Sequence, residues 1–143
     1  MRAGKLAFNL GLTDASGWCP VDRRTFASSR HPDVFVIGDA SIADAMPKSG
    51  FSANTQAKVT ARAVVDQLAG REPGEPIWEN TCYALAGSEY GLFVADVFRL
   101  KEGKITQISG PRYLPLDAAP TKIRLAAAYQ QAWLKTFTED CFA

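Results

Sequence analysis

Long apolar runs, cysteine-rich motifs and an excess of one charge are all missing from this 143-residue sequence. No stretch approaches the roughly 20 apolar residues of a transmembrane helix, and residues 1–5 (MRAGK) do not begin a signal peptide, so we expect no membrane span or export signal. A formal net charge of +1 gives no electrostatic basis for binding nucleic acid or a membrane surface. The composition, 47% hydrophobic and 22% charged, is typical of a globular protein.

Cysteine and histidine, the usual zinc ligands, are also scarce. The three cysteines, Cys19, Cys82 and Cys141, are odd in number and widely spaced, so they match neither a zinc pattern nor a closed set of disulfides. The single histidine, His31, precedes Pro32 at the entrance to a predicted strand, and we interpret it as structural or exposed, not as a base. The sequence therefore predicts no metal site.

The most informative stretch that is present is residues 34–40, VFVIGDA. Its apolar, β-branched start predicts a buried strand over residues 34–37, and Gly38-Asp39 would follow at the carboxyl end, where open α/β sheets bind ligands. Gly38 lets a ligand approach the backbone, and Asp39 can accept hydrogen bonds from sugar-alcohol hydroxyls. The alternative interpretation is a turn closed by an Asx hydrogen bond.

A helix is predicted directly after this turn. Residues 46–51, MPKSGF, lead into a run over residues 52–68 with apolar residues at helical spacing. The backbone N–H groups and positive dipole end of this helix suit a phosphate or an electron-rich ring edge, and Lys48 adds a full charge there. The alternative is a capped surface helix with a solvated lysine.

The pattern changes after residues 70–76, GREPGEP, which have the Pro and Gly content of a linker. Three extended segments follow at residues 82–85, 90–99 and 105–108, with a hairpin turn over 101–104. A final helix begins at Thr121, with apolar residues at helical spacing at Ile123, Ala127, Leu134 and Phe137. The sequence thus predicts an α+β fold: a strand–helix unit, then a small antiparallel sheet with a C-terminal helix.

Several of these blocks resemble a known family. Residues 29–39, SRHPDVFVIGD, resemble the second FAD motif of two-dinucleotide-domain flavoproteins, with Ser29 where Thr is usual and Val36 where Ala is usual. Further blocks are similar to the flavoprotein subunit of flavocytochrome c sulfide dehydrogenase: residues 16–22 (SGWCPVD), 46–51 (MPKSGF), 53–59 (ANTQAKV) and 80–83 (NTCY).

The resemblance implies roles for particular residues. Asp39 would hold the ribitol chain of FAD, with Gly38 allowing close approach. Lys48 and the backbone of Ser49, Gly50 and Phe51 would lie near the pyrimidine edge of the isoalloxazine. Cys82 would be half of a redox disulfide beside the flavin, whose other cysteine lies in an amino-terminal region that this chain lacks. Sulfide would attack that disulfide, and the electrons would pass through the flavin to a c-type cytochrome subunit, in the periplasm.

The same resemblance implies that a part of the enzyme is missing. Such flavoproteins open with a Rossmann unit, and no Gly-x-Gly-x-x-Gly spacing occurs in this sequence. We therefore expect the carboxy-terminal third of the enzyme, with residues 1–72 as the remnant of the FAD-binding domain. Residues 73–143 would be the C-terminal flavin-binding and interface domain. The chain alone is expected neither to retain FAD nor to be active.

Two other interpretations remain. The chain could be a non-catalytic interaction module that self-associates as a homodimer, because the predicted strand at residues 34–37 would have an exposed edge. It could also be part of a related quinone or nicotinamide disulfide oxidoreductase, although residues 80–83 argue against that. Aromatic residues that could wall a flavin, but that suit an ordinary core better, are Trp78, Tyr83, Tyr90, Phe93, Phe98 and Trp133.

Overall fold

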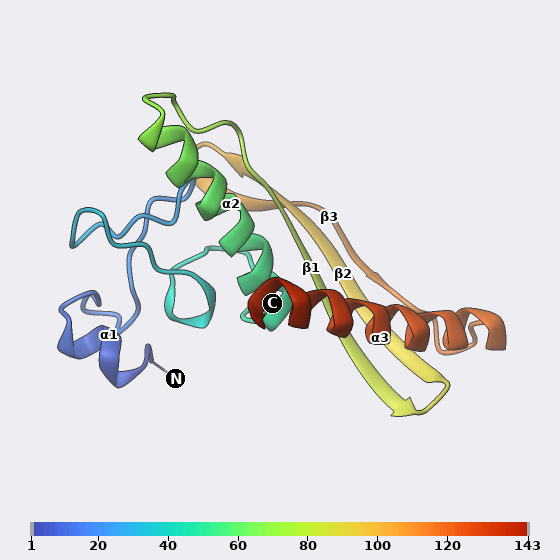
Figure 1. Ribbon diagram of the computed structural model, residues 1–143. Helices are drawn as coiled ribbons and strands as arrows, with labels where there is room; N and C mark the ends of the chain where they lie inside the picture. Colours follow the sequence, from blue (N-terminus) through green and yellow to red (C-terminus); the bar gives the residue numbers. More distant parts are fainter. Residues whose placement is uncertain (1, 143) are drawn as a thin grey trace. The chain divides into compact units, whose positions relative to one another are not determined.

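The computed structural model describes residues 2–142 and confirms the predicted α+β class. Three helical elements precede the sheet, and a long helix follows it (Figure 1). In chain order the elements are α1 (Lys5–Asn9), the short 3-10 helix η1 (Gly38–Ala40), α2 (Gly50–Leu68), β1 (Ile77–Gly87), β2 (Tyr90–Lys101), β3 (Lys104–Tyr113) and α3 (Pro120–Phe142).

The three strands form one antiparallel sheet in the order β1-β2-β3. The turn predicted at residues 101–104 is confirmed: Glu102 and Gly103 connect β2 to β3 with φ values of 50° and 75°, the left-handed conformation that a tight hairpin turn requires. Each strand extends beyond its predicted segment. Hairpin pairing supplies the backbone hydrogen bonds, so residues of low strand propensity at the ends are recruited as well.

The chain divides into two compact units, and the strands contribute to both. The first unit holds the residues up to Asn80 together with Val97–Ile108, and the second holds Thr81–Asp96 together with the residues from Ser109 onward. Each strand therefore has one segment in each unit.

The first unit has its own hydrophobic core, made by strand residues and by the irregular chain that precedes α2. Its centre is the edge-to-face pair of Phe26 and Trp78, whose ring centroids lie 6.1 Å apart. Phe98 and Ile105 from β2 and β3 are each 1% exposed and complete this centre. The remaining members are Val21 and Met46, with Val36, Ala43, Val59 and Leu100 packed at the edge.

The strand predicted at residues 34–37 does not form as a ladder. Phe35 makes one isolated antiparallel bridge with Ala27, and the flanking bonds are Ser28 N–H to the Val34 carbonyl at 2.7 Å and Val36 N–H to the Phe26 carbonyl at 3.0 Å. The prediction assumed parallel neighbours, which the described residues do not supply, so the segment pairs instead with the chain just before it. The segment expected to drive dimer formation thus has no strand ladder, although Val34 and Ile37 remain 38% and 37% exposed.

In the second unit, α3 packs closely on the sheet. Pro120 opens the helix, one residue before the predicted start and at a position that suits its fixed φ. The buried residues Ala126 and Ala127 lie against Gly91 of β2, where an added Cβ would be 2.2 Å from the Ala127 nitrogen. Only glycine permits this approach between strand and helix.

Further along α3, Trp133 occupies the packed face. Its ring lies 6.2 Å from that of Tyr83 and 5.1 Å from that of Phe137, the latter pair being stacked. Burial raises the pKa of Tyr83, and the nearby Tyr129 adds to the effect. Leu134, which the helical spacing placed on the packed face, is 57% exposed instead.

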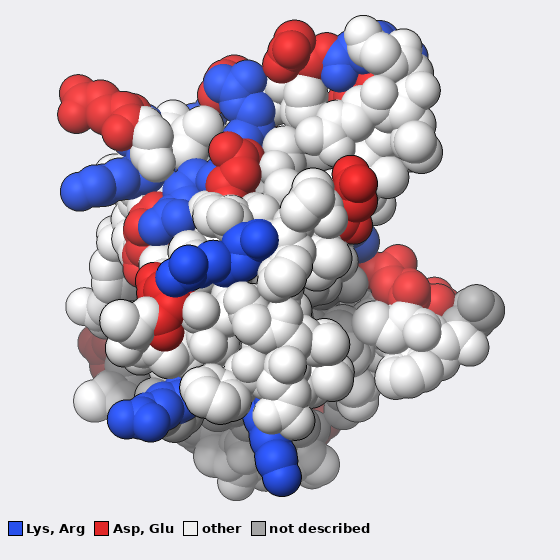
Figure 2. All heavy atoms as spheres, turned by 90° about the vertical axis from the view of Figure 1, so that its left-hand side faces the viewer, with Lys and Arg blue, Asp and Glu red and all other residues white. Residues whose placement is uncertain are grey.

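The described surface carries mixed charge. Figure 2 shows basic and acidic side chains lying beside one another on one face of the molecule. On α2, the buried Asp66 carboxylate pairs with Arg62 at 3.0 Å and with Arg71 at 2.7 Å, and bonds from Arg71 and then Arg62 lower the pKa of that carboxyl. Within residues 2–142 no helix is both long and apolar enough to cross a membrane.

Candidate functional site

The Gly38-Asp39 turn is the 3-10 helix η1, in front of α2. Gly38 has a φ of +69°, and an added Cβ would lie 3.3 Å from the Ala53 Cβ on α2, so both conformation and space favour glycine. Asp39 is exposed, and its carboxylate has no partner among residues 2–142. Its oxygens are therefore available to accept hydrogen bonds from a ligand.

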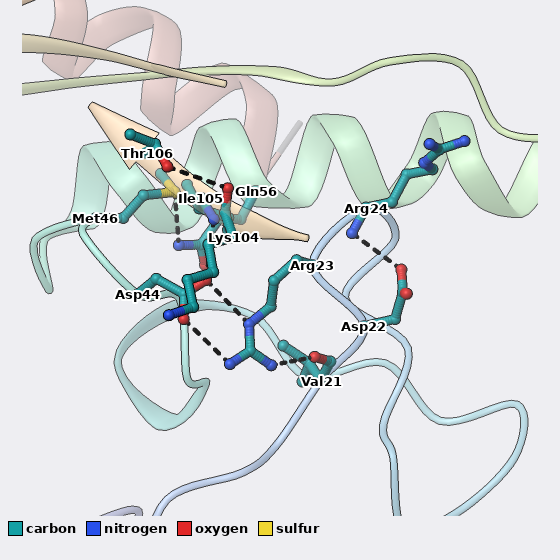
Figure 3. A network of polar contacts seen from close by, with 10 residues as sticks. All are labelled: Val21, Asp22, Arg23, Arg24, Asp44, Met46, Gln56, Lys104, Ile105 and Thr106. Carbon is teal, nitrogen blue, oxygen red and sulfur yellow. Dashed lines mark hydrogen bonds and ion pairs between the residues drawn. The ribbon is translucent and has the colours of Figure 1, made fainter. Parts of the chain in front are cut away.

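The turn is held to α2 by a buried amide. Gln56 is 2% exposed, and its Oε1 accepts a hydrogen bond from the Gly38 N–H at 2.7 Å. Its Nε2 lies 3.6 Å from the Met46 sulfur (Figure 3). Gln56 thus fixes the position of η1 relative to the helix.

Lys48 is anchored by the loop that it follows. Its ammonium group donates hydrogen bonds to the backbone carbonyls of Asp39 and of Ser41, the latter at 3.3 Å. It also lies 3.8 Å from the centre of the Trp18 ring, within range of a cation–π interaction. The positive charge is therefore held near the start of α2, while the side chain as a whole remains exposed.

The start of α2 is tied to β1 by a small polar cluster. Ser49 is the N-cap, and its hydroxyl oxygen accepts from the Ser52 N–H at 3.1 Å. The Ser49 and Ser52 hydroxyls donate to Oδ1 of Asn80 at 2.6 and 3.2 Å, and Asn80 is 1% exposed. A helix end and a strand of the first unit are thus joined through one buried side chain.

These groups surround a cavity of about 160 Å³ in the first unit. Trp18 and Met46 give it apolar walls, whereas Lys48, Ser49 and Gln56 bring polar atoms to it. Gly38 lines it as well, so the cavity extends to the η1 turn. Apolar and aromatic walls with a few polar groups are typical of sites for small molecules and cofactors.

The loop that forms another wall of this cavity is fastened to the sheet by Asp44. Its carboxylate pairs with Arg23 through two bonds of 3.1 Å and accepts from the Ile105 N–H at 3.0 Å, and Arg23 also bonds the Val21 carbonyl (Figure 3). Burial works to raise the pKa of Asp44, but the bonds from Arg23 and from Ile105 outweigh it, and the net shift is downward.

The cysteines differ strongly in environment. Cys82 lies in the second unit, on β1, and is exposed, as is Cys141 on α3. Cys19 lies in the first unit with 0% exposure, and burial, followed by the charge of Asp14, raises the pKa of its thiol. None of the three forms a disulfide within the described part of the chain.

Residues 74–142 match a family model described as "Flavocytochrome c sulphide dehydrogenase, flavin-binding". This segment is similar to that family. The resemblance found in the sequence is thereby confirmed, and the match implies a flavin cofactor for the enzyme in which the segment occurs. The matched residues include Cys82 and α3. The residues that line the cavity, from Trp18 to Gln56, all precede the match.

The matched segment and the cavity thus carry different parts of the predicted site. Of the predicted residues, Gly38, Lys48 and Ser49 line the cavity, and Asp39 is exposed on the same turn. Gly50 and Phe51 form the first turn of α2. Cys82 belongs to the second unit. Within residues 2–142, no three or more His, Cys, Asp or Glu side chains gather in a way that could hold a metal ion.

Three residues of the site had no role assigned from sequence: Trp18, Gln56 and Asn80. All three lie inside blocks that carry the family resemblance, residues 16–22, 53–59 and 80–83. Their position in those blocks was the one sign in the sequence that these residues could belong to the site. Their contacts join residues 10 to 31 positions apart in the chain, so no local pattern could assign them.

Proposed function

We propose that this chain forms part of an FAD-dependent sulfide dehydrogenase that passes electrons to a c-type cytochrome subunit. The observation that carries the proposal is the family match over residues 74–142, which includes Cys82 with an exposed thiol on β1. The alternative of a related quinone or nicotinamide enzyme has no comparable support.

In the first unit, the chain's own groups fit one end of a flavin. The Asp39 carboxylate, which has no partner among the described residues, would accept hydrogen bonds from ribitol hydroxyls, and Gly38 would let the ligand approach. Lys48 would hold a positive charge near the start of α2, where charge and helix dipole together favour an electron-rich ring edge. When bound, FAD supplies a two-electron acceptor. The pyrophosphate site would come from outside this sequence.

Cys82 would act as half of a disulfide with a cysteine that is not among the three of this chain. Hydrosulfide would attack one sulfur of that disulfide, breaking the S–S bond, forming a persulfide and releasing the other sulfur as a thiolate. An exposed position on β1 leaves the Cys82 sulfur accessible to a small nucleophile.

Replacing Cys82 tests this proposal. In the flavin-loaded enzyme, Cys82→Ser should abolish bleaching of the flavin absorbance by sulfide while flavin stays bound, since a hydroxyl can neither form nor exchange a disulfide. Cys141→Ser, which changes the other exposed thiol, is the matched control and should bleach normally. Bleaching of the Cys82→Ser enzyme at the native rate would rule out the proposed role.

A second candidate, self-association without catalysis, is favoured by the apolar side chains that remain exposed. In α1, Leu6 and Phe8 are 74% and 71% exposed, and on α3 Leu125 and Tyr129, one helical turn apart, are 48% and 54% exposed. Light scattering over a dilution series tests it. A mass of two chains that falls on dilution would support self-association, and a constant mass of one chain would exclude it.

A further inference from the structure

We infer that Gln56 is a ligand-binding residue of the cavity, whose side-chain N–H donates to a carbonyl oxygen on the edge of a planar heteroaromatic ring, such as a pyrimidinedione. The inference rests on the proposed flavin site and adds a residue to it. Its basis is the pair of contacts that the Gln56 amide makes, together with its burial and its position in the cavity wall.

The first contact fixes which way the amide points. A backbone N–H can only donate, so the atom that receives the Gly38 N–H at 2.7 Å must be the carbonyl oxygen of Gln56. The NH₂ group is then turned the other way, toward Met46 in the cavity wall (Figure 3). The donor orientation follows from hydrogen bonding and not from a choice between two similar atoms.

The second contact leaves the amide NH₂ of Gln56 without a strong hydrogen-bond acceptor. An amide NH₂ has two hydrogens, and its one acceptor among the described residues is the Met46 sulfur at 3.6 Å, a weak acceptor. Gln56 is 2% exposed, so bulk water offers little compensation. A buried donor of this kind costs free energy unless a stronger acceptor enters the cavity.

The groups around the Gln56 amide indicate what kind of ligand would carry that acceptor. Trp18 presents a ring to the cavity, which suits a flat ligand, and the Lys48 ammonium beside it favours a ligand edge rich in electron density. The hydroxyls of Ser49 and Ser52 already donate their hydrogens to Asn80, so they cannot donate to a ligand as well. A volume of about 160 Å³ admits one edge of a ring system and not a whole dinucleotide.

The test uses the intact chain, labelled with ¹⁵N, and lumiflavin as the probe, because lumiflavin has the ring and no ribitol chain. Nuclear magnetic resonance detects the side-chain NH₂ signal of Gln56 and the Gly38 amide even when binding is weak. We expect both signals to move during the titration.

Two variants separate donation from structure. At pH 8, Gln56→Glu keeps an oxygen for the Gly38 N–H and removes the donor, so it should weaken lumiflavin binding at least fivefold while the Gly38 amide stays protected from hydrogen exchange. Thr60→Val is the control, since Thr60 is buried one turn further along α2, has an unpartnered hydroxyl among the described residues and does not line the cavity. It should bind lumiflavin as the native chain does.

The outcomes distinguish this inference from the proposed function. If lumiflavin moves the Trp18 and Lys48 signals but not the Gln56 side chain, or if Gln56→Glu binds equally well, Gln56 is not a ligand-binding residue and the flavin site stands. If no signal from the cavity moves up to the solubility limit of lumiflavin, the flavin contact proposed for the first unit fails as well. If Gln56→Glu does not fold, the titration of the native chain still shows whether lumiflavin moves the Gln56 side-chain signal.

Discussion

Replacement of Gly91 by alanine is expected to destabilise the second unit strongly. The new Cβ would lie 2.2 Å from the Ala127 nitrogen, 2.5 Å from the Ala126 carbonyl carbon and 2.6 Å from the Ala127 Cα, whereas non-bonded carbon atoms prefer about 3.5–4 Å. All three atoms are backbone, so no side chain can rotate away. The helix α3 would have to move by more than an ångström, and Ala126 and Ala127 would lose their packing.

Overpacking typically costs 1–3 kcal/mol, and the rigid neighbours place Gly91→Ala at about 3 kcal/mol, roughly a hundredfold in the unfolding equilibrium. The control is Gly87→Ala in the same hairpin, where the nearest atom to an added Cβ is the Tyr90 Cβ at 3.7 Å. That change should be neutral or slightly stabilising, since alanine restricts the unfolded chain.

Urea unfolding followed by circular dichroism gives the stability difference, and hydrogen exchange of peptides from β2 and α3 assigns it to the second unit. In Gly91→Ala, faster exchange should be confined to those peptides at low denaturant. Equal unfolding midpoints for Gly91→Ala and Gly87→Ala would show that α3 does not approach β2 as closely as described.

Three further outcomes are expected. Asp44→Asn should cost about 1–2 kcal/mol at pH 7, because a charge-assisted pair with Arg23 is lost at a partly exposed site. Since the folded-state pKa of Asp44 is lowered, its contribution is present above the unfolded value near 4 and is lost as the pH falls through the folded value, so urea midpoints of native and variant chains should converge below about pH 4. A thiol reagent should modify Cys82 and Cys141 in the native chain and Cys19 only after unfolding; rapid labelling of all three would contradict the burial of Cys19. The chain purified alone should carry no stoichiometric FAD absorbance, and a yellow protein would refute this.

Elements with strong local signals could be predicted from the sequence. The helix α2 was expected from residue 52 and begins at Gly50, because Ser49 caps it and adds two residues to the first turn. The turn between β2 and β3 was located correctly because Glu102-Gly103 suits a tight hairpin.

Features that depend on which other segment an element meets could not be predicted. The segment at residues 34–37 has the composition of a buried strand, but its pairing was decided by residues 26–28. The helical spacing of apolar residues predicted that Leu134 lies on the packed face of α3. Trp133 lies there instead, in contact with Tyr83, and Leu134 is exposed. A period of 3.6 residues leaves neighbouring positions nearly equivalent, and the choice between them comes from the surface that the helix meets.

The same distinction applies to the site. Gly38 and Asp39 stood out because a turn after an apolar run is a local signal. The direction of the Lys48 ammonium was not predictable, because its acceptors are backbone carbonyls that any sequence would provide. Gln56 gave no signal of its own, since it contacts Gly38 across 18 positions of the chain.

The core of the first unit spans the linker at residues 70–76. Phe26 and Met46 lie before the linker, whereas Trp78, Phe98 and Ile105 lie after it. A chain cut at the linker would therefore yield two pieces that each carry half of one hydrophobic core. Such pieces are suited to fragment complementation: each should be poorly structured alone, and mixing them should restore the Phe26–Trp78 contact, which makes the linker the place to divide this protein for a split reporter.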